Sequence, residues 1–196
     1  MRIVIATRNE DKFREISKIL GGSAVEALPL ADFKDVPEVD ETGETLEENA
    51  LLKAESASKA TGLPALADDT GLFVDVINGE PGVRSSRFAG ENATYEDNRN
   101  LLLSKLEGVP EENRTAKFVC IASLVDGNNS ISTKGVAKGI ITSSARGSNG
   151  FGYDPIFQSE HSEMTFGELS DEEKMAFSHR EKAFNEMLRI LKEMYA

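Results

Sequence analysis

The sequence predicts an α/β fold in a single domain, and three patterns indicate it. The chain opens on an apolar strand that leads directly into an amphipathic helix. A second helix is marked by a pair of capping residues and is followed by strand-like segments. Further along, two β-rich segments flank a tight turn. With 196 residues the chain is long enough to bury one sizeable core, so we expect one domain over residues 1–196.

The first strand is predicted over residues 2–7, because the apolar run IVIA suits a strand that is buried on both faces. Apolar residues then recur at helical spacing as far as Leu20, and Gly21 with Gly22 ends the helix. The turn TRNEDK, residues 7–12, therefore lies at the carboxyl end of a strand, where open α/β sheets bind ligands.

The second helix is predicted from Thr45, which forms a capping box with Glu48, to about Gly62. A short strand over residues 63–67 then carries the motif ADDTG at its carboxyl end. We expect a separate strand over residues 72–77, followed by a turn at NGEPG.

The second half of the chain continues with a helix, a hairpin and two capped helical segments. Segments 116–125 and 130–141 flank the turn DGNN and predict a β-hairpin. The glycine-rich loop GSNGFGYDP follows the hairpin. Three capping pairs predict a helix to about residue 107, a short helical turn, and a last helix through Tyr195: Thr94 with Asp97, Ser170 with Glu173, and Ser178 with Glu181.

Composition and charge exclude several classes of protein. Hydrophobic residues make up 39% and charged residues 29% of the chain, as in a soluble globular protein. A net charge of −12 repels the nucleic-acid backbone, and no local basic stripe offsets it, so we expect no nucleic acid polymer as partner. A small anionic substrate remains compatible, because a bound cation and a few Lys or Arg side chains outweigh a distant net charge.

The beginning of the chain and its cysteine content indicate the compartment. The apolar run after Met1 is too short for a signal peptide or a membrane span, so we expect a cytoplasmic protein without a membrane partner. Cys120 is the only cysteine, which excludes an internal disulfide and a cysteine-based zinc site. Its apolar setting, FVCIASLV, predicts an inert thiol in the core.

The turn TRNEDK has the outline of a phosphate site. Backbone N–H groups at the start of the first helix are expected to be unpaired, the helix dipole is positive there, and Lys12 adds a full charge. The alternative is an ordinary capped helix with a surface lysine.

The motif ADDTG is a candidate magnesium site. Side chains alternate along a strand, so Asp68 and Asp69 both reach one metal ion only if the strand ends there, and Gly71 permits such a break. Carboxylate ligands suit Mg²⁺ or Mn²⁺. The acidic stretch PEVDETGETLEEN offers a further ligand. The alternatives are an Asp-rich turn and a solvated acidic face.

Two later segments are candidates for binding a planar base. GSNGFGYDP combines glycines, which permit close approach of backbone to a ligand, with Phe151 and Tyr153, whose rings can stack on a base. A loop with core aromatics is the alternative. His179 and Arg180 lie at a helix start, where their positive charge is unfavourable with the dipole unless an anion or acceptor lies nearby.

Six segments, in order, resemble the Ham1-like family of inosine and xanthosine triphosphate pyrophosphatases. They are TRNEDK, ETGETLEENALLKA, ADDTGL, PGVRSSRFAG, SNGFGYDPIF and SHREKA, and the resemblance runs nearly end to end. Arg8 stands where glycine is frequent in the family, and Asn149 stands where a second glycine usually occurs. The resemblance implies a long twisted mixed β-sheet flanked by helices, with two lobes around a central cleft, and a homodimer.

The resemblance also implies roles for individual residues. Asp69 would be the catalytic base, and the metal ligands for Mg²⁺, with Mn²⁺ as a substitute, would be Glu41, Asp68 and Asp69. The triphosphate would be bound by Thr7, Arg8, Asn9, Glu10, Asp11, Lys12 and Lys53, with Thr70 on phosphate or sugar. The nucleoside would be bound by Phe151, Gly152, Tyr153 and Asp154, and the base by Lys174, His179 and Arg180.

The implied activity is hydrolysis of ITP, dITP and XTP to the monophosphate and pyrophosphate, which removes deaminated purines from the nucleotide pool. Two alternatives are a Maf-like nucleotide pyrophosphatase of other base specificity and a nucleotide-binding regulator without turnover. The SHR and FGYDP segments argue against the Maf-like alternative, and the acidic residues Glu41, Asp68 and Asp69 favour an enzyme.

Overall fold

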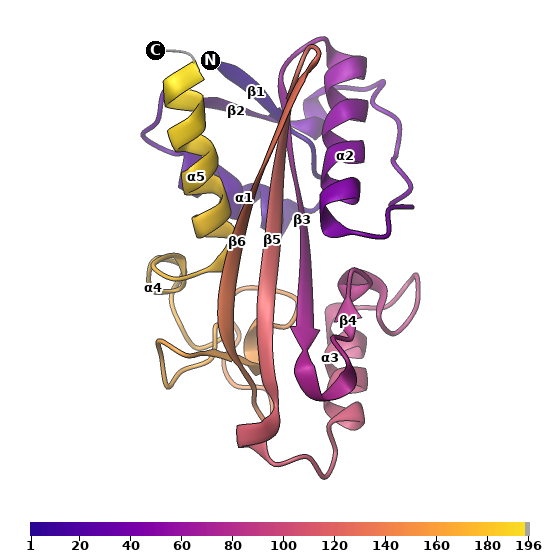
Figure 1. Cartoon of the computed structure of the whole chain (residues 1–196), viewed down its shortest axis with the longest axis vertical. Coiled ribbons are helices and arrows are strands. Elements are labelled where there is room, and N and C mark those ends of the chain that lie inside the picture. Colours follow the sequence, from indigo (N-terminus) through magenta and orange to yellow (C-terminus); the bar gives the residue numbers. More distant parts are fainter. Residues whose placement is uncertain (195–196) are drawn as a thin grey trace. The chain divides into compact units, whose positions relative to one another are not determined.

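The computed structural model describes residues 1–194 and is an α/β protein built on one mixed sheet (Figure 1). The helices are α1 (Glu10–Leu20), α2 (Leu46–Thr61), α3 (Tyr95–Lys105), α4 (Asp171–Met175) and α5 (His179–Met194). The strands are β1 (Arg2–Ile5), β2 (Glu26–Pro29), β3 (Ala65–Val74), β4 (Pro81–Gly82), β5 (Thr115–Asp126), β6 (Asn129–Ile141) and β7 (Phe157–Ser159). Short 3-10 turns are Leu30–Asp32, Asp75–Ile77, Ser85–Arg87, Glu111–Asn113 and Asp154–Ile156.

Within the described residues the strand order is β2-β1-β3-β5-β6-β7, and β4 pairs with β3. β1 is parallel to β2 and to β3, whereas β4 and β7 are antiparallel to their neighbours β3 and β6. The prediction of an α/β fold with a mixed sheet flanked by helices is confirmed. No helix in residues 1–194 is both long enough and apolar enough to cross a membrane.

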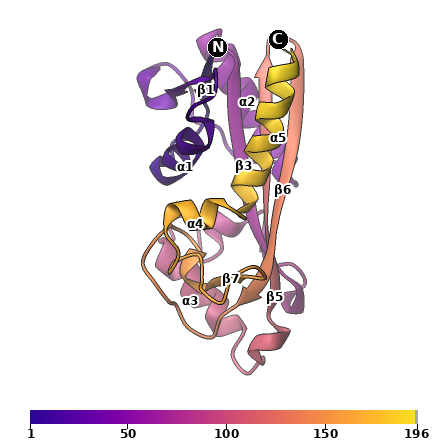
Figure 2. The same ribbon diagram turned by 90° about the vertical axis from the view of Figure 1, so that its left-hand side faces the viewer.

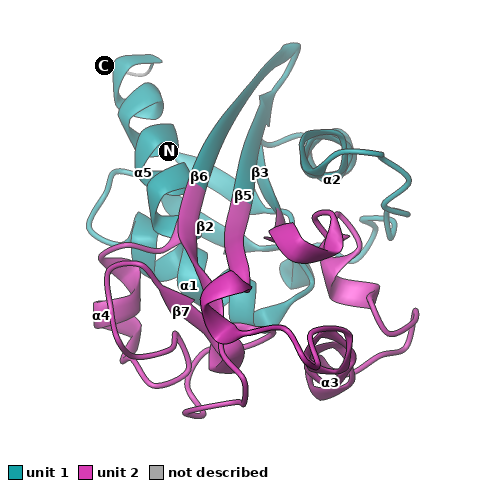
Figure 3. Cartoon of the chain, turned by 60° about the horizontal axis from the view of Figure 1, so that its bottom comes forward, with its two compact units in different colours: residues 1–69, 120–135, 180–196 teal, residues 70–119, 136–179 magenta. Residues whose placement is uncertain are grey.

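The chain divides into two compact units, which Figure 3 shows in different colours. Unit 1 consists of residues 1–69, 120–135 and 180–196, and unit 2 of residues 70–119 and 136–179. The strands β3, β5 and β6 contribute residues to both units.

Unit 1 buries its helices against the strands. The alanines of α2 pack on β3 in one apolar cluster, in which Ala54 and Ala57 meet Ala65 and Ala67. Small residues at these positions bring the helix backbone close to the strand. α5 lies alongside β6 (Figure 2), and the hydroxyl of Thr133 donates to the carbonyl oxygen of Ala183 at 2.8 Å.

Unit 2 is organised around a cluster of aromatic side chains. The rings of Phe118 and Phe157 lie 4.6 Å apart, and those of Phe157 and Phe166 lie 5.0 Å apart. All three rings belong to one buried cluster, which also contains Leu102 of α3 and Tyr153. This core supports the loop that precedes β7.

Most predicted boundaries are confirmed by the capping residues. Asn9 caps α1, Gly21 follows its last residue, and Gly62 ends α2 in a left-handed conformation. Capping boxes begin α2, α3 and α4 at the three predicted residues: Thr45, Thr94 and Ser170. The hairpin is present as β5 and β6. The predicted last helix is α5, and Tyr195 lies outside the described residues.

The prediction of two strands around ADDTG is wrong, because β3 runs without interruption from Ala65 to Val74. Gly71 does not break this strand. A Cβ atom at Gly71 would lie 2.6 Å from the carbonyl oxygen of Gly82, so the glycine permits the close approach of β4. The first strand also ends at Ile5, earlier than predicted, and the short strands β2, β4 and β7 were not predicted.

Candidate active site

The register of β1 and β3 places the start of α1 beside the two aspartates. Ile5 pairs with Leu66, and the Ala6 N–H donates to the Leu66 carbonyl oxygen at 2.8 Å. The chain that leaves β1 for α1 therefore passes next to the residues that follow Leu66 on β3. As a result the Lys12 ammonium lies 3.2 Å from Asp68 Oδ2.

Asp69 faces helix α2. Side chains alternate along β3, so Asp69 shares the face on which Ala65 and Ala67 pack against α2. Lys53 of α2 contacts Asp69 Oδ1 through its ammonium at 3.2 Å, and the Asn49 amide lies 3.4 Å from Asp69 Oδ2. Asn49 and Lys53 are one helical turn apart and therefore present their side chains on the same face of α2.

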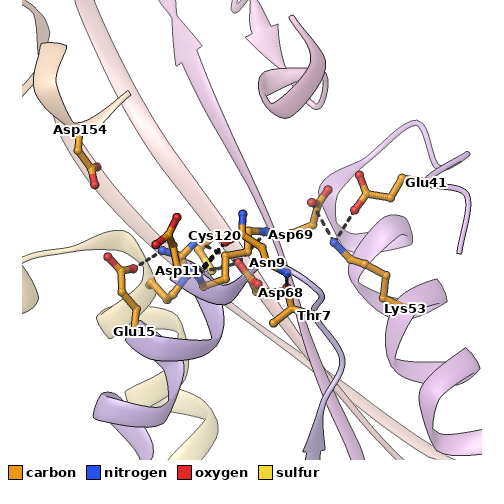
Figure 4. Close-up of polar contacts among 12 residues, drawn as sticks. Thr7, Asn9, Asp11, Glu15, Glu41, Lys53, Asp68, Asp69, Cys120 and Asp154 are labelled. Carbon is orange, nitrogen blue, oxygen red and sulfur yellow. Dashed lines mark hydrogen bonds and ion pairs between the residues drawn. The ribbon is translucent and has the colours of Figure 1, made fainter. Parts of the chain in front are cut away.

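The loop before α2 brings a second carboxylate to the same ammonium (Figure 4). Glu41 Oε1 accepts from Lys53 Nζ at 2.7 Å, so Glu41 and Asp69 share one cation. Asn49 ties this loop to the site, because its Oδ1 accepts the Gly43 N–H at 2.8 Å. A Cβ atom at Gly43 would lie 2.6 Å from that oxygen, and only glycine allows the approach.

Asp68 points to the opposite face of β3 and is fully buried. Its Oδ2 receives the Arg180 guanidinium of α5 at 3.2 Å as well as the Lys12 ammonium of α1. Arg180 also forms an ion pair with Glu15 of α1, and Cys120 Sγ lies 4.0 Å from Asp68 Oδ2. Asp68 and Arg180 thus link β3, α1 and α5. Cys120 is buried, as predicted.

Burial and neighbouring charges shift the acid–base properties of the cluster. Burial raises the pKa of the Asp69 carboxyl above its usual value, although the ammonium groups of Lys53 and Lys12 act in the opposite direction. Burial lowers the pKa of Lys53, but the carboxylates of Asp69 and Glu41 outweigh it and the net shift is upward. Lys53 therefore remains a cation at neutral pH. Shifted carboxyls beside fixed cations are typical of catalytic sites.

The donor set of Glu41 and Asp69 fits a divalent metal ion. Mg²⁺ prefers oxygen ligands and usually engages one or two protein carboxylates together with water and substrate phosphates. Two carboxylates that already share one cation meet that requirement. Within residues 1–194, no group of three or more His, Cys, Asp or Glu side chains is arranged to hold a metal. Asp68 lies on the other face of β3, so the assignment of Glu41, Asp68 and Asp69 together as ligands stays a prediction.

The start of α1 differs from the expectation of unpaired N–H groups. Asn9 Oδ1 accepts from the backbone N–H of Asp11 at 3.0 Å and of Lys12 at 3.1 Å, and Thr7 Oγ1 accepts the Asn9 N–H at 3.2 Å. These caps satisfy donors that were expected to bind phosphate. Arg8 stands where the family frequently has glycine, and its guanidinium donates to the Val36 carbonyl oxygen at 2.8 Å. The arginine thus links this turn to the segment around Val36. The remaining residue of this turn, Glu10, is exposed.

In unit 2 the predicted nucleoside-binding loop is held by a buried ion pair. Lys174 Nζ lies 2.7 Å from Asp154 Oδ2, and the same oxygen accepts the Phe151 N–H at 2.9 Å. Gly150 is required here, because a Cβ atom would lie 2.1 Å from Asp154 Oδ2. The Lys174 ammonium lies 5.3 Å from the centroid of the half-buried Phe151 ring, and the Tyr95 ring lies 5.8 Å from it.

Other predicted residues of unit 2 have structural contacts. Tyr153 is a core residue rather than an open stacking surface: its ring is buried, its hydroxyl donates to the Ser85 carbonyl oxygen at 2.8 Å, and burial raises its pKa. His179 is also buried and stacks on Phe118 at 4.5 Å. The Gly152 carbonyl accepts from Arg99, Thr70 is half-buried on β3, and Asn149 donates to the Leu169 carbonyl oxygen at 2.9 Å.

Sequence reasoning missed three residues of these clusters: Glu15, Asn49 and Tyr95. Asn49 offered a signal, because asparagine is a poor helix former and one inside a helix calls for a specific hydrogen bond. Glu15 offered none, since its partner Arg180 is 165 residues away in the chain. Tyr95 lies at the first position of α3, and nothing in its neighbourhood predicted a contact with Phe151.

The fold and the charges of unit 1 define a class of protein: an α/β protein whose buried carboxylates and lysines form a candidate site for a divalent metal and a phosphate group. The Ham1 family matches residues 3–190, and the chain belongs to this family. A dITP/XTP pyrophosphatase from Geobacter sulfurreducens is 51% identical over 193 residues, which cover 98% of this chain and 95% of that protein.

Further relatives extend the similarity to solved structures. A dITP/XTP pyrophosphatase from Thermoanaerobacter pseudethanolicus is 46% identical over 98% of this chain and 100% of its own length. A HAM1 protein from Coxiella burnetii has a TM-score of 0.88 with 41% identity and covers 98% of this chain and 99% of its own. The Ham1 protein of Staphylococcus aureus has a TM-score of 0.87 with 39% identity and covers 99% and 100% of the two chains. The Maf-like alternative is not favoured.

Proposed function

We propose that this chain hydrolyses purine nucleoside triphosphates with a deaminated base, namely dITP, ITP and XTP, to the monophosphate and pyrophosphate. The observation that carries the proposal is the convergence of Glu41 and Asp69 on one cation in a chain of the Ham1 family. The relatives named dITP/XTP pyrophosphatase align over almost the whole chain and support the choice of substrate.

Asp69 is the proposed catalytic base. Its carboxylate is held from both sides, by Lys53 at Oδ1 and by Asn49 at Oδ2, so its orientation is restricted before substrate arrives. The carboxylate accepts a proton from the water that attacks the α-phosphorus. The bond from that phosphorus to the bridging oxygen breaks, and pyrophosphate leaves with the electron pair. When bound, Mg²⁺, or Mn²⁺ in its place, supplies Lewis-acid stabilisation of the phosphate charge.

Lys12 and Lys53 are the proposed phosphate-binding cations. Both ammonium groups contact carboxylates of β3, and each has a flexible stem that lets it turn to a phosphate oxygen. Their positive charge stabilises the pyrophosphate leaving group as negative charge develops on it.

Base recognition is proposed for unit 2, with Phe151 as the stacking ring and Lys174 as a hydrogen-bond donor. Hypoxanthine and xanthine carry a carbonyl where adenine carries an amino group. A hydrogen-bond donor of the protein at that position is therefore satisfied by hypoxanthine or xanthine but has no acceptor when adenine is bound. An unpaired buried donor costs about 1–3 kcal/mol, and more than one such contact gives strong rejection of ATP. Guanine has the same carbonyl, so exclusion of GTP depends on its 2-amino group.

The proposal includes a cytoplasmic location, where the nucleotide pool is found, one functional domain over the whole chain, and a homodimer. The dimer is tested by light scattering after gel filtration, and a mass equal to one chain would refute it. The alternative from another class is a nucleotide-binding regulator without turnover. The proposed role of Asp69 as a general base argues against it, because a regulator needs no such base.

The decisive experiment is a panel of ITP, dITP, XTP, ATP and GTP assayed with Mg²⁺ and again with excess EDTA. We expect pyrophosphate and monophosphate from the first three nucleotides and no product with EDTA. Release of inorganic phosphate with a diphosphate product would refute the reaction type. Equal cleavage of ATP would refute the base preference, and binding without cleavage would favour the regulator.

The base is tested by Asp69→Asn, which keeps the size of the side chain and removes the proton acceptor. We expect kcat to fall about 100-fold or more, because general-base catalysis contributes at least that factor. The melting temperature should change little. Asp75→Asn is the control, since this carboxylate of unit 2 is exposed and accepts a hydrogen bond from the Thr115 hydroxyl rather than from Lys53 or Asn49. Near-normal turnover by Asp69→Asn would exclude Asp69 as the base.

A further inference from the structure

The Lys53 ammonium occupies the position between the two carboxylates that a divalent ion would share. Its distances are 2.7 Å to Glu41 Oε1 and 3.2 Å to Asp69 Oδ1. The lysine side chain is only 14% exposed, and the Asp69 side chain only 8%. The contact is therefore a sheltered ion pair in which solvent screens the charges weakly.

The same carboxylate oxygens cannot serve the lysine and a metal ion equally well. A carboxylate bound to an ammonium gives up lone pairs that a metal would use, and an ammonium beside a divalent cation is repelled by it. A metal that binds Glu41 and Asp69 must therefore displace Lys53 or lose affinity. Lys12 differs in this respect, because it contacts Asp68 on the other face of β3.

A triphosphate supplies the alternative partner for the displaced lysine. The Lys53 side chain has a flexible four-carbon stem, and a phosphate oxygen is a good acceptor for its ammonium. A nucleotide that arrives with its own metal ion brings both an anion for Lys53 and a cation for Glu41 and Asp69. The nucleotide brings negative charge together with the metal, whereas metal binding alone adds two positive charges beside an ammonium.

We propose that Lys53 is a built-in competitor for the divalent metal, which blocks metal binding at Glu41 and Asp69 until a nucleoside triphosphate is bound. The metal and the nucleotide then load together. This inference rests on the proposed function, because it takes Glu41 and Asp69 as metal ligands. It adds a gate that keeps the free protein from holding a metal ion at its reactive carboxylate.

The test is Mn²⁺ binding to the full-length protein without nucleotide, measured as the loss of the free-ion signal in electron paramagnetic resonance. Lys53→Met and Lys53→Gln remove the competitor, and we expect each to bind Mn²⁺ at least about tenfold more tightly than the unaltered chain. This factor follows if Lys53 occupies the site about nine-tenths of the time, because only the remaining tenth of the protein can then bind the metal. Addition of Glu41→Gln to Lys53→Met should abolish the tightened binding. Circular dichroism checks that each variant is folded.

Lys12→Met is the matched control, since it removes one ammonium that is also paired with a β3 carboxylate. A general effect of net charge would tighten Mn²⁺ binding equally in Lys12→Met and Lys53→Met, and that result would overturn the proposal. Unchanged Mn²⁺ affinity in both Lys53 variants would overturn it as well. Pyrophosphate release from ITP by the unaltered chain is measured in parallel, so failure of the gate is distinguished from failure of the proposed function.

Discussion

Replacement of Arg180 by methionine tests whether this residue is a structural link of unit 1. The guanidinium is 2% exposed and forms ion pairs with Asp68 and Glu15. Methionine preserves much of the apolar volume but removes the charge. Asp68, which has no solvent exposure, then still contacts the Lys12 ammonium at 3.2 Å.

The expected cost is large because the carboxylate left behind is buried. Removal of one partner from a buried ion pair costs about 3–5 kcal/mol of the free energy of unfolding. For a chain of this length that corresponds to a fall of about 6–20 °C in melting temperature. Arg189→Met is the control: Arg189 is 58% exposed and pairs with Glu186 and Glu193 on the same helix, so solvent screens its ion pairs and its loss should change the free energy of unfolding far less.

Urea unfolding followed by circular dichroism measures both variants. The double variant Asp68→Asn with Arg180→Met removes both charges and should recover part of the loss, which isolates the coupling between the two side chains. A loss below about 1 kcal/mol in Arg180→Met would refute the assignment of a buried structural ion pair. Retained stability with a strongly raised KM would instead favour the predicted contact with the base.

Two further predictions compare variants that share one local chemistry and differ in one contact. Asn49 and Asn98 are both buried, and the side-chain amide of each forms hydrogen bonds with backbone groups. Alanine at either position should therefore lower the free energy of unfolding in urea by about 1–3 kcal/mol. Only Asn49→Ala should also lower kcat, because Asn49 contacts Asp69 and Asn98 does not. Equal kcat values in the two variants would refute that role. Gly147 and Gly108 have nearly the same positive φ, +78° and +79°. A Cβ atom added at Gly147 would lie 2.0 Å from the backbone oxygen of Gly167, whereas a Cβ atom added at Gly108 would have no heavy atom within 4 Å. Gly108→Ala should therefore cost about 1–2 kcal/mol and Gly147→Ala about 1–3 kcal/mol more, and similar melting temperatures would contradict this.

Local signals in the sequence predicted the helices well. Thr45, Thr94 and Ser170 each cap the helix whose start they predicted, since a capping side chain needs only the N–H groups two or three residues away. The hairpin of β5 and β6 was predicted for the same reason, because its turn lies between strands adjacent in the chain. The edge strands were missed, since β2 and β7 have four and three residues and form only by pairing with distant partners.

The error at ADDTG has a different cause. A glycine after two aspartates is an ordinary turn signal, and the residues around it contain nothing to contradict a turn. What decides the conformation is β4, whose Gly82 carbonyl lies where a side chain at Gly71 would be. Strand continuity in turn sends Asp68 and Asp69 to opposite faces, and this separates a carboxylate that binds Arg180 from one that binds Lys53.

By itself the sequence determined the α/β class, most helix boundaries, the Ham1 resemblance and most of the acidic and basic residues of the candidate site. These features depend on residue types and on spacings of a few positions, and both can be read directly from the sequence. Only the tertiary structure decided which charge meets which: that Glu41 and Asp69 share the ammonium of Lys53, and that Arg180 pairs with Asp68. Ion pairs act over a few ångströms, and the partners here come from elements that are far apart in the chain and are brought together only by strand pairing and helix packing.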